Sequence, residues 1–149
     1  RGDVRMLRYP DQQIPHSSAA RSAIVKRLAG IVDECEIGTI WTTWEGDPHC
    51  DHQMAASLAR QLVTARQHLA LWRFLIWGRF ARQRVGLTGR LVRFDGRPYR
   101  RVKTSAITAH RSQMTPVIAD SRSAFMMPWP MQRHFINSPE FFLKAYADG

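Results

Sequence analysis

A strand followed by a short polar loop and an amphipathic helix is the pattern that most constrains the fold of this chain. Residues 37–43 are mostly β-branched or aromatic, which is typical of a buried strand. Residues 53–62 place apolar side chains at positions 55, 58, 59 and 62, the spacing of a helix with one face for a core. Open α/β sheets bind their ligands at the carboxyl ends of such strands. The sequence therefore points to the loop at 44–52 as the place for a site.

This loop carries two imidazoles and a carboxylate at close spacing. His49 and His52 stand three residues apart, so both can lie on one side of a first helical turn. Asp51 is close enough to orient one of the rings. The spacing suits a metal site or acid–base chemistry. It equally suits a histidine pair that contacts only solvent, because Asp47 and Pro48 are ordinary residues for a loop that enters a helix.

Residues 47–56 resemble the second metal motif of the PIG-L/LmbE-like zinc N-deacetylases. Three further segments are similar to that family in the same order. Residues 7–11 resemble the segment after its third strand, 103–113 resemble its Lys-x-x-Ala-Ile-x-x-His-x-Ser-Gln helix, and 138–142 resemble its closing Pro-Glu-x-Phe. The likeness covers nearly the whole chain. It implies a Rossmann-like three-layer α/β fold, and removal of an N-acetyl or other N-acyl group from an amino sugar or its conjugate.

The chain departs from the family at one motif. Family members carry Ala-His-Pro-Asp-Asp-Glu after their first strand, and its His and second Asp bind zinc while its first Asp is the general base. The only Pro-Asp pair here is Pro10-Asp11, which Tyr9 precedes. Residues 4–7 read as the tail of a strand. We therefore expect residues 1–149 to be a single partial deacetylase domain, incomplete at the N-terminus because the sequence is truncated or the gene is split.

The resemblance also implies roles for single residues. His52 would bind zinc beside the ligands of the absent motif, and a zinc-bound water would supply the nucleophile. His49 would face the substrate as an acid or as a partner of the carbonyl oxygen, with Asp51 holding its other ring nitrogen and favouring the imidazolium. Asp51 could instead only complement the helix dipole. Asp11 and His110 are assigned to the substrate pocket, and a His110 bonded in the core is the alternative.

Other patterns predict the remaining elements. A helix with Ser17 or Ser18 as its cap is expected through residue 35, and a strand over 69–77. Asp95-Gly96 predicts a hairpin between strands at 91–94 and 99–102, with Pro98 placing the second strand at an edge. A helix over 103–114 should end before Pro116. Ser138 as cap and Pro139 at the first position predict a last helix.

A formal net charge of +10 favours a different kind of function. Basic residues crowd the segment 79–103 against one acid, Asp95, and aromatic residues flank them: Arg79, Arg82, Arg84, Arg90, Arg93, Arg97, Arg100, Arg101 and Lys103. Such a segment is typical of a phosphate-binding or membrane-surface face. The alternative function is a non-enzymatic module that binds nucleic acid or anionic lipid. A third hypothesis is an anionic substrate, such as a sugar on a nucleotide or phospholipid. No motif for specific nucleic-acid recognition supports the alternative.

The cysteines and the hydropathy give the remaining expectations. Cys35 and Cys50 do not make a disulfide framework, and no apolar run reaches the length of a membrane span, so the cytoplasm is the expected location. Cys50 stands where the family usually has Pro. Its side chain should point away from the two histidines, so we do not expect its thiolate to bind the metal.

Overall fold

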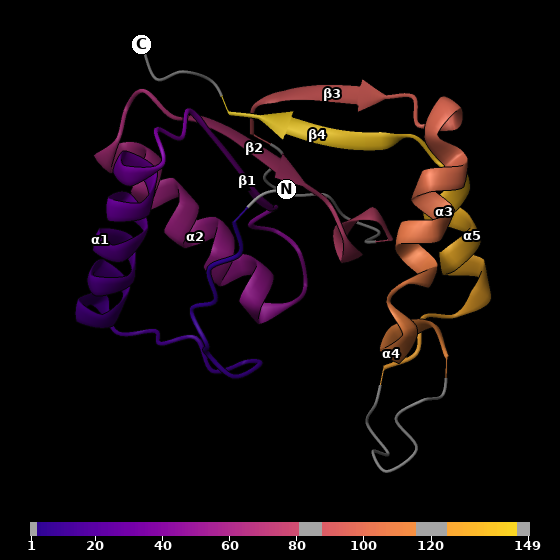
Figure 1. The fold of residues 1–149 in the computed structure, drawn as a ribbon, viewed down its shortest axis with the longest axis horizontal. Coiled ribbons are helices and arrows are strands. Elements are labelled where there is room, and N and C mark those ends of the chain that lie inside the picture. Colours follow the sequence, from indigo (N-terminus) through magenta and orange to yellow (C-terminus); the bar gives the residue numbers. More distant parts are fainter. Residues whose placement is uncertain (1–2, 81–87, 116–124, 146–149) are drawn as a thin grey trace. The chain divides into compact units, whose positions relative to one another are not determined.

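The computed structural model describes residues 3–80, 88–115 and 125–145. They fall into two units (Figure 1). The first comprises residues 1–92 and 142–149, and the second comprises residues 93–141. The first unit contains the loop that carries His49 and His52.

In the first unit, two helices and two parallel strands alternate along the chain. The helices are α1 (Ser18–Glu34) and α2 (Cys50–Ala65), and the strands are β1 (Thr39–Thr43) and β2 (Ala70–Phe74). The hydroxyl of Ser17 accepts a hydrogen bond from the Ala20 N–H and so caps α1. In the register of the parallel pair, Trp41 stands opposite Trp72. The strand expected at 37–43 and the helix that follows it are confirmed.

A four-stranded sheet has the order β1-β2-β4-β3. β4 (Glu140–Lys144) runs antiparallel to β2, and β3 (Arg90–Phe94) lies beyond it at the edge. A short 3-10 helix, η1 (Trp77–Arg79), follows β2, so the strand expected at 69–77 ends earlier than predicted. The mixed sheet with its helices confirms the α/β class.

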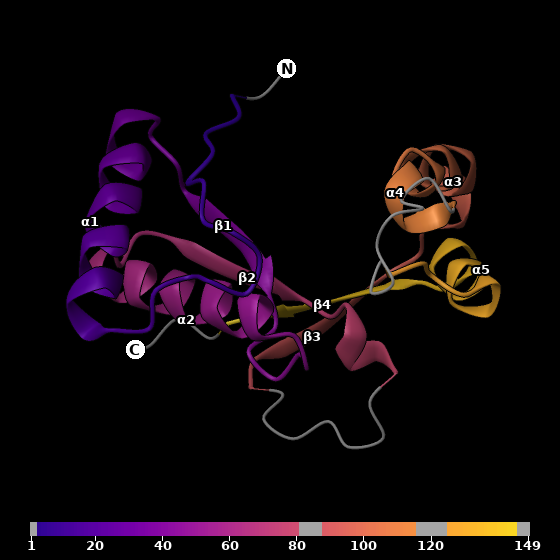
Figure 2. The same cartoon turned by 90° about the horizontal axis from the view of Figure 1, so that it is seen from below.

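The core lies between the helices and one face of the parallel strands, as Figure 2 shows for α1 and α2. One buried cluster joins Ala29, Val32, Leu62 and Leu69, and a second joins Ile24, Met54 and Leu58. Ile40 packs against the first cluster, so the alternation of a strand puts Trp41 on the other face. There Trp41 stacks on Trp72 with ring centroids 5.2 Å apart.

The second unit is mainly helical. It contains the 3-10 helix η2 (Arg97–Tyr99) and the helices α3 (Arg100–Thr108), α4 (Arg111–Met114) and α5 (Trp129–Asn137). The Lys103 ammonium donates to the Ser138 carbonyl, 3.3 Å away, and forms an ion pair with Glu140. The helix expected over 103–114 begins earlier, at Arg100, and is interrupted at residues 109–110.

The predicted hairpin around Asp95-Gly96 is wrong. The Asp95 carboxylate accepts a hydrogen bond from the Arg97 N–H, 3.1 Å away, and pairs with the guanidinium of the same residue. This local turn leads the chain into η2 and α3, so residues 99–102 are helical. Pro98 therefore lies within η2 and not in an edge strand. The sheet neighbour of β3 is β4, which comes from the end of the chain.

Two further predictions are wrong. Ser138 and Pro139 do not start a helix, because α5 ends just before them with Ser138 as its C-cap, and the chain then enters β4. The Ser138 N–H donates to the His134 carbonyl, 2.9 Å away, which closes the last turn of α5. Residues 4–7 form no strand and run as irregular chain. None of the helices in the described ranges is long and apolar enough to cross a membrane.

Candidate metal centre

The candidate site begins where β1 ends and α2 starts. Trp44, which follows β1, is 1% exposed, and its backbone N–H donates to the Phe74 carbonyl at 2.9 Å. His49 is the N-cap residue of α2, and its ring nitrogen Nδ1 accepts a hydrogen bond from the Asp51 N–H at 3.2 Å. An imidazole thus takes the place of the usual hydroxyl or carboxylate cap. The expected position of both histidines at the mouth of a helix is confirmed.

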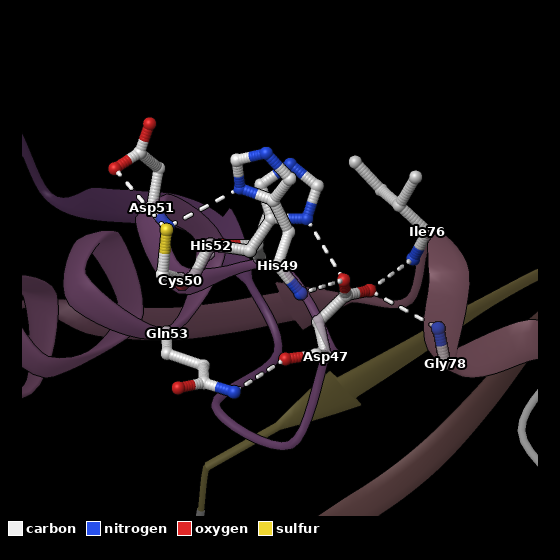
Figure 3. A network of polar contacts seen from close by, with 9 residues as sticks. Asp47, His49, Cys50, Asp51, His52, Gln53, Ile76 and Gly78 are labelled. Atoms are coloured by element: carbon white, nitrogen blue, oxygen red, sulfur yellow. Dashed lines mark hydrogen bonds and ion pairs between the residues drawn. The ribbon is translucent and has the colours of Figure 1, made fainter. Parts of the chain in front are cut away.

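The two imidazoles lie side by side at the first turn of α2, as Figure 3 shows. Their ring centroids are 4.8 Å apart and the ring planes differ by 34°. The Nδ1 atom of His52 lies 2.9 Å from Oδ1 of Asp47. The His52 side chain is 23% exposed.

Asp47 is a member of the site that the sequence did not indicate. Its side chain is fully buried, and its carboxylate also accepts hydrogen bonds from the N–H groups of Gly78 at 3.1 Å and Ile76 at 3.2 Å. Burial alone would raise the pKa of Asp47, but the hydrogen bonds from His52, Gly78 and His49 outweigh it and hold the pKa below its usual range. A buried carboxylate therefore stands behind the imidazole of His52.

The predicted contact between the Asp51 carboxylate and the ring of His49 is not formed. Oδ2 of Asp51 instead accepts a hydrogen bond from the Gln12 N–H at 2.9 Å. Asp51 touches His49 only through its own backbone N–H, which can only donate, so Nδ1 of His49 carries no proton. In this geometry the ring proton of a neutral His49 lies on Nε2. The catalytic role of Asp51 stays a prediction.

The other predicted residues lie as follows. Asp11 is exposed in a turn of the first unit, next to the Gln12 whose N–H reaches Asp51. His110 is exposed and precedes α4 in the second unit. Cys50 is exposed as a free thiol, with its sulfur 4.0 Å from a carboxylate oxygen of Asp51. The substrate-binding roles of Asp11 and His110 stay predictions.

The described residues do not close a metal site by themselves. Nowhere in these ranges do three or more His, Cys, Asp or Glu side chains come together in a way that could hold a metal ion. A tightly bound catalytic zinc needs three protein ligands. His52 fits one ligand position, because its Nδ1 is bonded to a carboxylate and its Nε2 is not.

The basic segment is divided between the two units. Arg97 and Lys103 are paired with acids, as described above, and Arg79 also has a partner. Arg90, Arg93, Arg100 and Arg101 are exposed. Arg82 and Arg84 lie outside the described residues.

Comparison with known proteins places the fold. No family model matches the chain, and no curated protein matches it. Among solved structures, the chain is similar to a crystal structure of the zinc-inhibited form of the teicoplanin deacetylase Orf2, with 15% identity and a TM-score of 0.55. The likeness covers 95% of this chain, which spans 59% of the length of that one. At this identity the likeness shows the α/β fold of a deacetylase, and function has to be argued from the site.

Proposed function

We propose that this chain carries one part of the catalytic site of a metal-dependent N-deacetylase, with His52 as a metal ligand and His49 as a hydrogen-bond donor to the substrate. The observation that carries this proposal is the pair of adjacent imidazoles at the start of α2, with a buried carboxylate behind His52. The similarity in fold to a deacetylase and the resemblance of residues 47–56 to the metal motif support it.

The chemistry assigned to each residue follows from its hydrogen bonds. When bound, the metal would supply Lewis acidity and an activated water. His52 would contribute the Nε2 lone pair that the contact with Asp47 leaves open. His49 would direct its Nε2–H at the carbonyl oxygen of the amide, where negative charge grows during attack. A neutral imidazole can stabilise this oxygen by a hydrogen bond without giving up its proton.

The remaining metal ligands are not among the described residues. The resemblance places them in an Ala-His-Pro-Asp-Asp-Glu motif, which this sequence does not contain. Zinc is the proposed cofactor, and an amino sugar or its conjugate with an N-acetyl or other N-acyl group is the proposed substrate. The similar structure is a deacetylase with zinc as its inhibitor. The assay should therefore compare stoichiometric with excess zinc.

The proposal is tested on the longest polypeptide encoded in frame with this sequence. Acetate release from N-acetylglucosamine conjugates is measured with added metal and after chelation. We expect release that chelation abolishes and that His49→Ala lowers by roughly a hundredfold to ten-thousandfold with the metal retained. Release that survives chelation, or that His49→Ala leaves unchanged, would contradict the proposal.

A second candidate function is binding to anionic phosphate groups through the second unit. Arg100 and Arg101 are exposed at the start of α3, close in sequence to Phe94 and Tyr99, whose rings stack with centroids 5.9 Å apart and are themselves exposed. Exposed arginines and exposed aromatic rings in one short segment suit a phospholipid surface or the phosphates of a conjugated substrate. We propose this contact as an addition to the deacetylase function, and replacing Arg100 and Arg101 tests it.

A further inference from the structure

Asp47 is the one fully buried carboxylate in the ranges that the structure describes. Three backbone N–H groups and one ring nitrogen surround it (Figure 3). Oδ2 accepts from the backbone of Ile76 and Gly78, and Oδ1 accepts from the His49 backbone at 3.4 Å and faces Nδ1 of His52. The Asp47 carbonyl oxygen also accepts a hydrogen bond from the Gln53 amide at 2.9 Å. The residue is thus fixed from both its side chain and its backbone.

The position of this carboxylate does not depend on His52. Three of its four partners are backbone N–H groups, which can only donate, and two of them come from the segment after β2. Both oxygens therefore act as acceptors in an orientation that the fold sets. A ring nitrogen 2.9 Å from such an oxygen has to bring the proton, so the neutral form of His52 carries its proton on Nδ1 and a lone pair on Nε2.

The neutral ring of His49 is held in the opposite tautomer. Its Nδ1 accepts from the Asp51 N–H, which leaves the ring proton on Nε2. The two neighbouring rings thus present a lone pair on Nε2 of His52 and an N–H on Nε2 of His49. A lone pair suits a metal, and an N–H suits a carbonyl oxygen.

We propose that Asp47 is the positioning residue of this site, which fixes the Nδ1–H tautomer of His52 before any metal binds, while the Asp51 backbone fixes the opposite tautomer of His49. The benefit of these tautomers for catalysis rests on the proposed function. The tautomers themselves are a property of this chain and can be measured without metal. Outer partners of this kind typically contribute tenfold to a hundredfold in metal affinity.

The experiment is nitrogen-15 NMR of the histidine rings in the metal-free chain at about pH 8.5, about two units above the ordinary histidine pKa. Long-range correlations to the ring carbon protons distinguish the two tautomers. We expect His52 as the Nδ1–H form and His49 as the Nε2–H form. An Nε2–H form of His52 in the unchanged chain would overturn the proposal, and this measurement needs no variant.

Asp47→Asn sharpens the test. The side-chain oxygen of Asn is needed by the N–H groups of Ile76 and Gly78, so its NH2 group turns toward His52 and donates to Nδ1, with loss of the longer 3.4 Å bond from the His49 N–H. We expect His52 to switch to the Nε2–H form, His49 to keep its own form, and zinc affinity to fall about tenfold to a hundredfold. Asp33→Asn, the same chemical change at an exposed residue of α1 that pairs with Arg66, is the control and should change neither tautomer.

The outcomes separate this inference from the proposed function. If Asp47→Asn lowers zinc affinity but His52 keeps its Nδ1–H, the positioning role is wrong while the metal site stands. If the tautomer switches as expected but His52 does not contribute to zinc binding in either protein, the positioning role stands and the proposed function fails.

Discussion

Replacing Gly78 with alanine should destabilise the protein through the packing behind the site. A Cβ at this position would lie 2.8 Å from Cε3 and 2.9 Å from Cζ3 of the Trp44 indole. Trp44 is 1% exposed, so its ring is enclosed and has little room to move away. Overpacking of this kind costs about 1–3 kcal/mol. For a chain of this size that corresponds to a fall in Tm of about 2–12 °C.

A matched control separates this packing effect from the effect of an added methyl group. Gly30 is exposed in α1, and a Cβ there would meet nothing within 4 Å. Gly30→Ala should therefore stabilise the protein by up to about 1 kcal/mol through helix propensity. Thermal unfolding of both variants, monitored by circular dichroism, should show a lower Tm for Gly78→Ala and a higher Tm for Gly30→Ala. A Gly78→Ala protein that melts at or above the unchanged protein would refute the reasoning.

Three further predictions concern the surface and the response to pH. Trp41 is 52% exposed on β1, an edge strand of the sheet, so the chain should self-associate with rising concentration in sedimentation experiments. Trp41→Glu should reduce this association more than Trp129→Glu does in the second unit, and a monomer at all concentrations would contradict the prediction. The pKa of Asp47 is lower in the folded chain than in the unfolded chain. The ionised Asp47 therefore stabilises the fold above its unfolded pKa of about 4, and this stabilisation is lost as the pH falls through the lower pKa of the folded chain. Urea unfolding between pH 6 and pH 2.5 should show that the free energy of unfolding falls more steeply with falling pH for the unchanged chain than for Asp47→Asn. Equal slopes of this free energy against pH would contradict the prediction. Arg100→Ala with Arg101→Ala should weaken binding to phosphatidylserine vesicles and lower its salt dependence, whereas Arg111→Ala with Arg133→Ala removes the same charge and should do less. Equal losses would mean that only net charge matters.

The elements around the site could be predicted from the sequence because local patterns determine them. The β-branched run that ends at Thr43 forms β1, and the helical spacing after His52 forms α2. The histidines were found for the same reason, since a helix start places residues three apart on one side.

Contacts between distant segments could not be predicted in this way. The donors that hold Asp47 come from Ile76 and Gly78, about thirty residues further along the chain, so a loop residue before a proline gave no sign of burial. β4 joins the sheet next to β2 from the end of the chain, whereas Asp95-Gly96 suggested a nearby hairpin partner for β3. Arg73 of β2 is 3% exposed, and its charge is paired with Glu45 and the Thr88 carbonyl, which lie elsewhere in the chain.

The affinity for zinc of three proteins, namely the unchanged chain, His52→Ala and His49→Ala, tests the central claim most directly. The unchanged chain should bind zinc weakly, because its described residues supply too few ligands for tight capture. His52→Ala should weaken this binding further, by more than about tenfold, since it removes a ligand and not merely a partner of one. His49→Ala should keep the affinity of the unchanged chain. Loss of zinc in His49→Ala together with its retention in His52→Ala would contradict the account.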